Sequence, residues 1–457
     1  MNENPPTAGC PAQPARFARR LTLLAALAVL LRLVVVLAVP TQPISDFWSY
    51  VSRAQHIVQR GEYAAFDGAP DANFPPAYPL AIALPIAAGV PPIAAAKAVN
   101  LACTAASVVL FGELAKLWFA APAGYAAAGL AALHPRLVLL PTLAASENLF
   151  LPLLLAWLHA ASRWLHSGRR TWAWLAGAFL GLATLTRSVA VALWLPLLVT
   201  SLALRRRGRA VAAGLLAILL AAAAVMMPWW LRNGVQLGLW SPLSTSAGIN
   251  LFMGNNAAAT GRYLPAWKEA LEAVDPGAAS AGVAERHRRA TRAALAWILA
   301  HPGDAASLYV RKLVDLVTNG NQALVHFAVT GADPHLPPGG VEVLPRDHWL
   351  RRHAKPLLHL LNAASLAIVV AALAGLAVAA ARARRGEREA LAGALLAAST
   401  ALYFPLLSAV FLALVRYRWP AEDVLLLLAA PALAGLVGAL SRWRSRSVGG
   451  PQGLAGR

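Results

Sequence analysis

The first substantial polar segment of the chain reads ISDFWSYVSRAQHIVQRGEYAAFDGAPDANFPPAYP (residues 44–79). It carries four acids and two bases, although the whole chain has 40 lysines and arginines against 20 acids. A helix is predicted to begin after Ser45, as an N-cap, and to stop at Gly61. Asp46 then lies in the first turn, where the helix dipole stabilises an ionised carboxylate, and Tyr50 shares its face. Asp46 is either an ordinary helix-terminal acid or a functional carboxylate.

The composition around this segment is that of a membrane protein. The chain has 457 residues, of which 58% are hydrophobic and 13% charged, whereas soluble domains carry about 25% charged residues. Several apolar runs reach the ~20 residues that cross a bilayer. The sequence therefore predicts an all-α polytopic membrane protein. Two cysteines, Cys10 and Cys103, indicate neither a disulfide nor a cysteine metal site.

About ten spans are predicted, with both termini in the cytoplasm. The formal charge of +20 is concentrated in basic clusters that mark cytoplasmic ends, and no aromatic-basic motif indicates nucleic acid as a partner. Arg32 interrupts the first span and should face protein or water. The short apolar run 77–90 is predicted to be re-entrant or interfacial. The predicted spans are 21–39, 93–119, 123–140, 147–165, two within 171–204 that turn near Arg187, 210–230, 357–381, 390–414 and 421–440.

These spans divide the chain into five regions, and no internal repeat is visible. A long polar tract separates two groups of spans, and the runs 284–300 and 302–317 within it are predicted to be amphipathic helices. The regions are a cytoplasmic tail 1–20, an N-terminal transmembrane module 21–230 with an outer first loop 40–79, an external region 231–355, C-terminal transmembrane helices 356–441 and a basic cytoplasmic tail 442–457.

Two acids are predicted at the outer ends of spans. Asp46 begins the first-loop helix, and Glu147 follows the short outer turn before the fourth span. Paired carboxylates can bind a divalent cation, or one of them can accept a proton from a substrate hydroxyl. Glu147 also fits a structural role as a helix N-terminal acid after Ser146. If the two acids form one site, the first-loop helix must fold over the turn before the fourth span.

Several arginines are predicted on the same outer side, and arginine suits bidentate binding of phosphate. Those beside aromatic residues can instead be interfacial anchors. His56, His134 and His301 have no metal-ligand spacing, and no Walker A, GxGxxG, CxxC, HExxH or GxSxG pattern appears. Nucleotide-fuelled and soluble-hydrolase mechanisms are therefore not indicated. The arginines in question are Arg187, Arg232, Arg262, Arg416 and Arg418.

The order of these features resembles the GT-C membrane glycosyltransferases, specifically bacterial relatives of protein O-mannosyltransferases and of the lipid A aminoarabinose transferase. Each matching motif is loose, but together they cover most of the chain. The matching stretches are DFWSYVSRAQHIVQRGEY (46–63), FPPAYPL (74–80), LPTLAASENLF (140–150), LTRSVAV (185–191), PWWLRN (228–233), STSAGINLFMGNNAAATGRY (244–263), HPGDAASLYVRKL (301–313) and VRYRWP (415–420).

The resemblance implies a GT-C bundle in a bacterial inner membrane, with a site facing the periplasm or exterior. A polyprenyl-phosphate-linked sugar would be the donor, and a lipid, a glycan or a protein the acceptor. Asp46 would be the main catalytic acid and Glu147 would support it, with no required cofactor implied and a divalent cation at these two acids left open. The substrate-binding candidates are Tyr50, His56, Tyr78, Arg187, Arg232, Asn255, Arg262, Arg416 and Arg418.

Two departures from the family pattern bear on the metal and on phosphate binding. The eukaryotic protein mannosyltransferases have an acid pair where Phe47 follows Asp46 here. The aminoarabinose transferase has a lysine before its double proline, and Phe74 takes that place here. Two other classes stay open: a transporter or lipid-linked glycan flippase, and a lipopolysaccharide polymerase or ligase with a large outer loop. Transporters often have paired halves and midplane charges, whereas this chain has one large outer tract.

Overall fold

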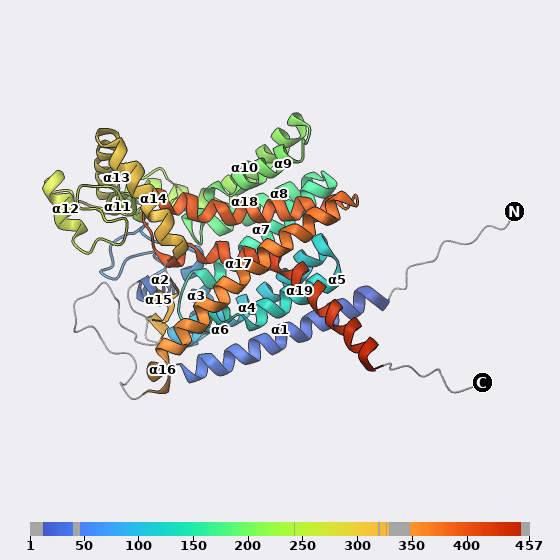
Figure 1. Cartoon of the computed structure of the whole chain (residues 1–457). Helices are drawn as coiled ribbons and strands as arrows, with labels where there is room; N and C mark the ends of the chain where they lie inside the picture. Colours follow the sequence, from blue (N-terminus) through green and yellow to red (C-terminus); the bar gives the residue numbers. More distant parts are fainter. Residues whose placement is uncertain are drawn as a thin grey trace, which may run out of the picture.

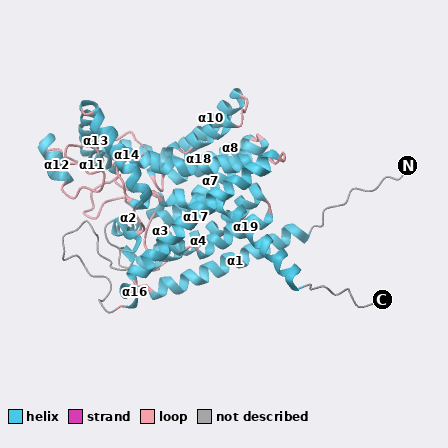
Figure 2. Cartoon of the chain, in the orientation of Figure 1, coloured by secondary structure: helices cyan, strands magenta, loops and turns pink. Residues whose placement is uncertain are grey.

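The chain forms a bundle of helices, and no strand occurs in the part of the chain that the structure describes (Figure 2). A single antiparallel bridge joins Ala64 and Pro70. Ser45, the predicted N-cap, and Cys10 lie outside the described residues. The structure is a computed structural model and describes residues 12–39, 46–241, 243–318, 320–325, 327–328 and 348–448.

Six described helices are long and apolar enough to cross a membrane. A seventh candidate is a pair, α5 (Ala121–Leu133) and α6 (Pro135–Leu139), bent by 54°. The six are α1 (Ala12–Ala38), α4 (Pro92–Phe119), α10 (Gly208–Leu237), α17 (Ala354–Arg384), α18 (Arg388–Phe411) and α19 (Trp419–Val448).

The other predicted spans are also helical and belong to the same bundle. Helix α7 (Glu147–Ser167) packs on α4 and on α8 (Arg170–Thr184). The chain then turns at Arg187 into the 3-10 segment η2 (Ser188–Ala192) and α9 (Trp194–Ala203). The run 171–204 therefore contains two helices that turn near Arg187, as the sequence predicts. Helix α10 continues seven residues beyond the predicted end at Trp230, to Leu237.

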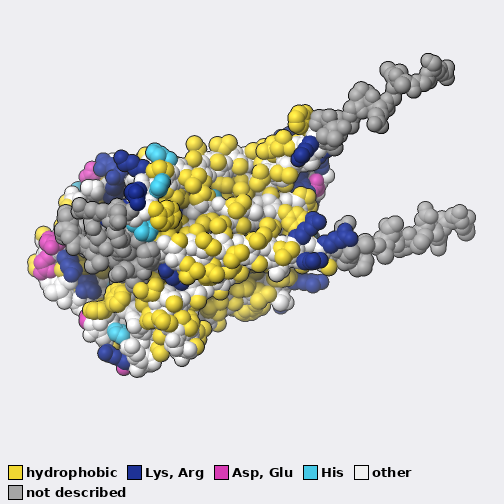
Figure 3. Space-filling model, turned by 90° about the horizontal axis from the view of Figure 1, so that it is seen from below, with side chains coloured by type: hydrophobic (Ala, Val, Ile, Leu, Met, Phe, Trp, Pro, Cys, Tyr) yellow, Lys and Arg dark blue, Asp and Glu magenta, His cyan; other side chains and the backbone are white. Residues whose placement is uncertain are grey.

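The bundle has two distinct ends. Helix α1 begins and α19 ends at one of them, which we call the N/C end, while α2, α12 and α13 lie at the other, the α2 end (Figure 1). Hydrophobic side chains cover the middle of the face seen in Figure 3, and Lys and Arg side chains gather towards both ends. Leu27 and Leu37 of α1 are 62% and 76% exposed, as expected of residues that face lipid.

Arg32, the charged residue within the first span, forms hydrogen bonds at a break between two helices. His134-Pro135 interrupts α5, because proline has no N–H and disfavours a helical residue before it. The Arg32 guanidinium donates hydrogen bonds to the carbonyls of Ala131 (2.7 Å), Ala132 (2.8 Å) and Leu137 (2.9 Å). Arg32 thus faces protein, as the sequence predicts, and it satisfies carbonyl groups at the break.

The first-loop helix has nearly the predicted bounds. Helix α2 (Asp46–Arg60) begins with Asp46 in its first turn and ends at Gly61, whose φ of +69° favours glycine. It packs against α3 (Ala77–Ala87), the short apolar helix predicted to be re-entrant or interfacial. Both helices lie at the α2 end (Figure 1).

Four helices of the long polar tract pack on one another at the α2 end. The two predicted amphipathic helices are present with a boundary at His301-Pro302. The first of them shares a small core with the helices before it, made of Leu251, Phe252, Leu271, Ala278, Ala290 and Ala294. The second packs instead on α18, where Leu316 is buried with Ala409 and Ala413. Two further short helices, α15 (Gln322–Val325) and α16 (Trp349–Arg352), precede α17. The four helices are α11 (Ser246–Gly254), α12 (Trp267–Val274), α13 (Val283–Ala300) and α14 (Pro302–Thr318).

Candidate active site

The two acids predicted from the sequence are each the first residue of a helix, and each forms an ion pair with an arginine. Asp46, the first residue of α2, forms an ion pair with Arg416. Glu147, the first residue of α7, forms an ion pair with Arg187, with 2.5 Å between Oε1 and Nη1. The partners are 370 and 40 residues away in sequence, so the fold and not local spacing makes both pairs.

One serine links the buried ion pair to helix α2. The Ser146 hydroxyl lies 3.1 Å from the Tyr50 hydroxyl, accepts a hydrogen bond from Arg187 Nη1 at 3.2 Å and reaches Glu147 Oε2 at 3.5 Å. Tyr50 is on the same helix as Asp46, one turn later. Helix α2 therefore does lie over the turn before α7, and the two carboxylates belong to one cluster of side chains.

An aromatic ring lies beside both guanidiniums. The Cζ atoms of Arg187 and Arg416 are each 5.8 Å from the centroid of the Tyr417 ring, within the range of a cation–π contact. Tyr417 and Arg416 belong to the short 3-10 segment η4 (Val415–Tyr417) between α18 and α19. The four charges of the cluster thus all lie at helix starts or breaks, where side chains can converge from four parts of the chain.

The two ion pairs differ in their access to solvent. The side chains of Asp46 and Arg416 are 27% and 18% exposed, whereas those of Glu147 and Arg187 are 5% and 11% exposed. Asp46 is therefore the carboxylate that a substrate can reach most directly. Burial, followed by the charges of Asp46 and Glu147, raises the pKa of the Tyr50 phenol above its ordinary value. Tyr50 consequently stays protonated and can act as a hydrogen-bond donor.

Tyr78 supports the cluster from behind. Its ring meets that of Tyr50 edge to face, with centroids 5.4 Å apart. Its hydroxyl donates to Asn100 Oδ1 at 2.8 Å, and Asn100 Nδ2 donates to the Leu143 carbonyl at 2.8 Å. Tyr78 is fully buried, and it packs against the Tyr50 ring and so limits its movement.

Arg232 lies outside the cluster and holds the first loop in place. It donates to the carbonyls of Asp71 and Tyr63, both at 2.6 Å, and its guanidinium lies over the rings of Tyr63 and Trp229. A buried ion pair between Arg53 and Asp71 fixes the same loop. Arg232 therefore contacts the first loop and not the charged cluster, and its role in substrate binding stays a prediction.

Three of the four remaining predicted side chains have partners outside the cluster. Arg262 donates to Asp315 of α14, and Arg418 donates to the carbonyls of Leu316 and Val317 and pairs with Glu422. Asn255 accepts a hydrogen bond from the buried ammonium of Lys312. His56 lies half-buried on α2. None of these contacts brings the four side chains to Asp46.

The donor set of the cluster does not fit a divalent cation. Each carboxylate already faces a guanidinium, so a bound cation would add positive charge beside two arginines. Within the described ranges, no group of three His, Cys, Asp or Glu side chains could hold a metal ion.

Sequence reasoning missed two members of the cluster. Ser146 directly precedes Glu147, and Tyr417 stands between Arg416 and Arg418. A small polar residue next to a candidate acid, and an aromatic residue between two arginines, were the available signals. Neither signal tells which side chains meet, because the contacts join distant parts of the chain.

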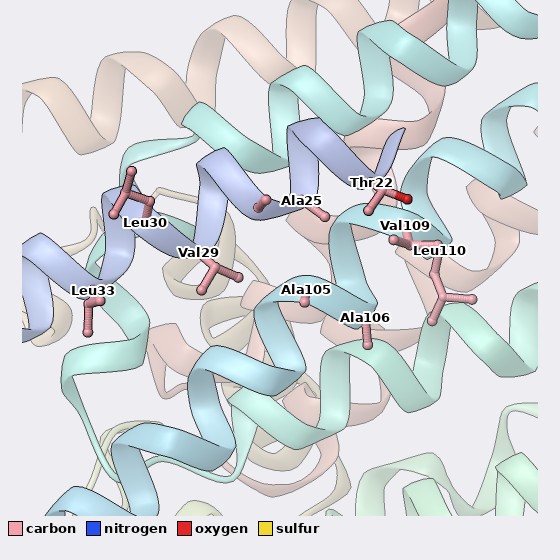
Figure 4. A pocket seen from close by; sticks show the side chains of 10 residues that line it. Thr22, Ala25, Val29, Leu30, Leu33, Ala105, Ala106, Val109 and Leu110 are labelled. Atoms are coloured by element: carbon pink, nitrogen blue, oxygen red, sulfur yellow. The ribbon is translucent and has the colours of Figure 1, made fainter. Parts of the chain in front are cut away.

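A separate groove lies between α1 and α4. It has a volume of about 770 Å³, and its lining is apolar apart from the Thr22 hydroxyl (Figure 4). The groove is lined by Ala25, Val29, Leu33, Ala105 and Val109 among others, and by no residue of the charged cluster.

Comparison with known proteins identifies the fold. Residues 73–231 match the family model of dolichyl-phosphate-mannose-protein mannosyltransferases. The oligosaccharyltransferase AglB of Archaeoglobus fulgidus, in complex with an inhibitory peptide and a dolichol-phosphate, superposes with a TM-score of 0.55 at 14% identity. The chain has the GT-C fold. This match covers 98% of the chain and 53% of AglB, so the chain spans about half the length of that protein.

Two more solved structures with the GT-C fold are similar. The apo form of the Archaeoglobus oligosaccharyltransferase gives a TM-score of 0.52 at 14% identity, covering 96% of this chain and 53% of that one. ArnT from Cupriavidus metallidurans, bound to undecaprenyl phosphate, gives 0.44 at 16% identity, covering 92% and 78%. No curated protein sequence matches the chain. The GT-C fold does not favour the transporter or ligase alternatives.

Proposed function

We propose that the chain is a glycosyltransferase that moves a sugar from a polyprenyl-phosphate donor to a hydroxyl of a lipid, glycan or protein acceptor. The reaction would take place at the α2 end, on the outer face of a bacterial inner membrane. Asp46 is the proposed base. Arg416 and Arg187 are the proposed partners of the donor phosphate, with Glu147 and Ser146 holding Arg187 in position.

The proposed step is a displacement at the anomeric carbon. The acceptor oxygen forms a bond to that carbon while the bond from carbon to phosphate oxygen breaks. The acceptor proton passes to Asp46, and the electron pair leaves with the polyprenyl phosphate. Arginines placed at the leaving phosphate stabilise the charge that develops there.

The Asp46–Arg416 pair suggests how the donor activates the base. A donor phosphate would compete with Asp46 for the Arg416 guanidinium. When Arg416 turns to the phosphate, the Asp46 carboxylate is free to accept a hydrogen bond from the acceptor hydroxyl. Binding of the donor would then prepare Asp46 to accept the acceptor proton.

The observation that carries this proposal is the joint cluster at the α2 end. A partly exposed carboxylate–guanidinium pair lies beside a buried one. The Tyr417 ring lies beside both guanidiniums, and Ser146 contacts the buried pair and Tyr50 of α2. Two comparisons give further support. The segment that matches the mannosyltransferase family model includes Glu147 and Arg187, and AglB, which has the same fold, binds a dolichol-phosphate.

The test is sugar transfer in purified membranes from a panel of radiolabelled polyprenyl-phosphate sugars. Asp46→Asn keeps size and hydrogen bonding but removes the base, so transfer should fall by about 10²–10⁴-fold with expression unchanged. The matched control is Asp67→Asn, because Asp67 is exposed and only caps the Ala69 amide at 3.0 Å. Wild-type transfer by Asp46→Asn would remove Asp46 from the mechanism.

A further inference from the structure

Helix α14 has three faces, which follow from a turn of about 100° per residue. The first is buried against its neighbours, the second is polar and exposed except at the partly buried Asp315, and the third is exposed and apolar. The buried face carries Leu308, Lys312 and Leu316; the polar face carries Asp304, Arg311, Asp315 and Thr318; the apolar face carries Val310, Val314 and Val317, which are 58%, 53% and 68% exposed. We call the last three residues the valine stripe.

The polar face is turned towards the polar loop before α12. Asp315 accepts two hydrogen bonds from Arg262, at 2.8 Å from Nε and 3.1 Å from Nη2. The side chain of Arg262 is 60% exposed. These are the contacts expected of a surface in water.

The opposite edge of α14 meets the lipid-facing side of a membrane span. The Tyr309 hydroxyl donates to the carbonyl of Leu406 in α18 at 3.1 Å. Leu406 is 47% exposed, and its neighbours Leu402 and Val410 are 61% and 41% exposed. Tyr309 lies at the edge of the buried face next to the valine stripe. The stripe therefore continues the apolar outer surface of α18.

We propose that the valine stripe is a membrane-contact surface, immersed in the acyl chains of the leaflet at the α2 end. Helix α14 would be an interfacial helix whose polar face lies among headgroups and water. The composition of the stripe favours lipid over a protein partner, because protein interfaces are rich in aromatic residues, Met and Arg at their centre. The stripe has only short aliphatic side chains.

This surface has a consequence for the charged cluster. Lys312 donates to the Phe411 carbonyl at 3.2 Å, and Arg418 donates to the Leu316 carbonyl at 2.9 Å. Helix α14 is thus hydrogen-bonded to the chain on both sides of Arg416, at Phe411 and at Arg418. The depth of α14 in the leaflet would set the depth of Arg416. Only this consequence rests on the proposed function, since immersion of the stripe can be measured without any transfer reaction.

The test uses two pairs of neighbouring positions that point about 100° apart. Single cysteines replace Val310 and Arg311, or Val317 and Thr318, in a Cys10→Ser, Cys103→Ala background, and carry an environment-sensitive fluorophore. The protein is reconstituted in phosphatidylcholine–phosphatidylglycerol vesicles. Labels at Val310→Cys and Val317→Cys should emit at shorter wavelength and be quenched by nitroxide-labelled lipid. Labels at Arg311→Cys and Thr318→Cys should be quenched by aqueous iodide.

Two results would overturn the proposal. Equal quenching by iodide at all four positions would place the stripe in water. Protection of the valine positions from both quenchers would show that protein, from this chain, a second copy or another partner, covers the stripe. Each pair also controls for folding, because a misfolded variant loses the difference in quenching between the two labelled positions. If that happens in one pair, the other pair tests the proposal.

Discussion

The cluster contains two carboxylate–guanidinium pairs that differ in burial, and this difference determines which of them a ligand can reach. The partly exposed pair, Asp46 and Arg416, is the one that can exchange partners with a ligand. The buried pair, Glu147 and Arg187, is held by Ser146 and excluded from water. A buried pair contributes little when intact, but removal of one member leaves an uncompensated charge. The two pairs therefore predict different phenotypes.

Replacement of Arg416 should impair donor binding. Arg416→Gln removes the guanidinium that the donor phosphate is proposed to take from Asp46. A hydrogen bond to a charged group contributes about 1.5–3 kcal/mol, so donor affinity should fall by about 10–150-fold. Arg262→Gln is the matched control, because Arg262 pairs with Asp315 on the surface. Binding of a polyprenyl phosphate by the purified protein measures both, and unchanged affinity in Arg416→Gln would contradict the assignment.

Replacement of Arg187 should impair stability as well as donor binding. In Arg187→Ala the buried Glu147 carboxylate loses its partner, which typically costs about 3–5 kcal/mol. The double variant Glu147→Gln, Arg187→Met should recover much of that loss, whereas Asp46→Asn should leave thermal stability close to wild type. Thermal unfolding in detergent distinguishes these outcomes. An Arg187→Ala variant with wild-type stability and wild-type donor affinity would contradict both roles.

At the scale of the helix, Arg32 should stabilise the broken pair α5 and α6. Arg32→Leu keeps an apolar helix α1 but leaves the carbonyls of Ala131, Ala132 and Leu137 without their donor. An unsatisfied buried acceptor costs about 1–3 kcal/mol, so the variant should unfold at a clearly lower temperature. Leu27→Ala on the lipid-facing side of α1 is the control and should unfold like the wild type. Equal unfolding of the two variants would show that the break needs no donor from Arg32.

The junction of α11 and α18 depends on a glycine. A Cβ at Gly254 would overlap the Phe411 carbonyl oxygen, so Gly254→Ala must push the two helices apart. Overpacking of this kind costs about 1–3 kcal/mol. It should also reduce transfer, because Arg416 lies five residues after Phe411. Gly282→Ala is the matched control, since no atom lies within 4 Å of its Cβ position. Retention of wild-type stability in Gly254→Ala would argue against this close approach.

At the scale of the whole molecule, hydrophobic length and turn residues predicted most elements. The bounds of α2, the turn at Arg187 and the two amphipathic helices at His301-Pro302 follow from local sequence. The partners of the arginines do not, because Arg416 meets Asp46 and Arg232 meets Asp71 across 370 and 161 residues. Spacing along the chain carries no information on such contacts. Ser146 was missed for the same reason, since its role depends on Tyr50 and Arg187.

The basic clusters predict the orientation of the molecule in the membrane. The connections 205–209 and 381–389 and the end of α19 are rich in arginine, and α1 begins where α19 ends (Figure 1). The positive-inside rule therefore predicts that the N/C end lies in the cytoplasm and that α12 lies outside. Within the tract between α10 and α17, Ala278 is buried, so the exposed neighbour Ser280 is the better reporter position.

In a Cys10→Ser background, Ser280→Cys should react with a membrane-impermeant maleimide in intact cells. Arg384→Cys, exposed at the end of α17, should react only after the cells are lysed. Cys103 is buried and should contribute little in either case. Both cysteines tested lie in exposed positions, so a difference in labelling reports the side of the membrane. Labelling of Arg384→Cys in intact cells, with Ser280→Cys protected, would place Asp46 and Arg416 in the cytoplasm and contradict transfer at the outer face.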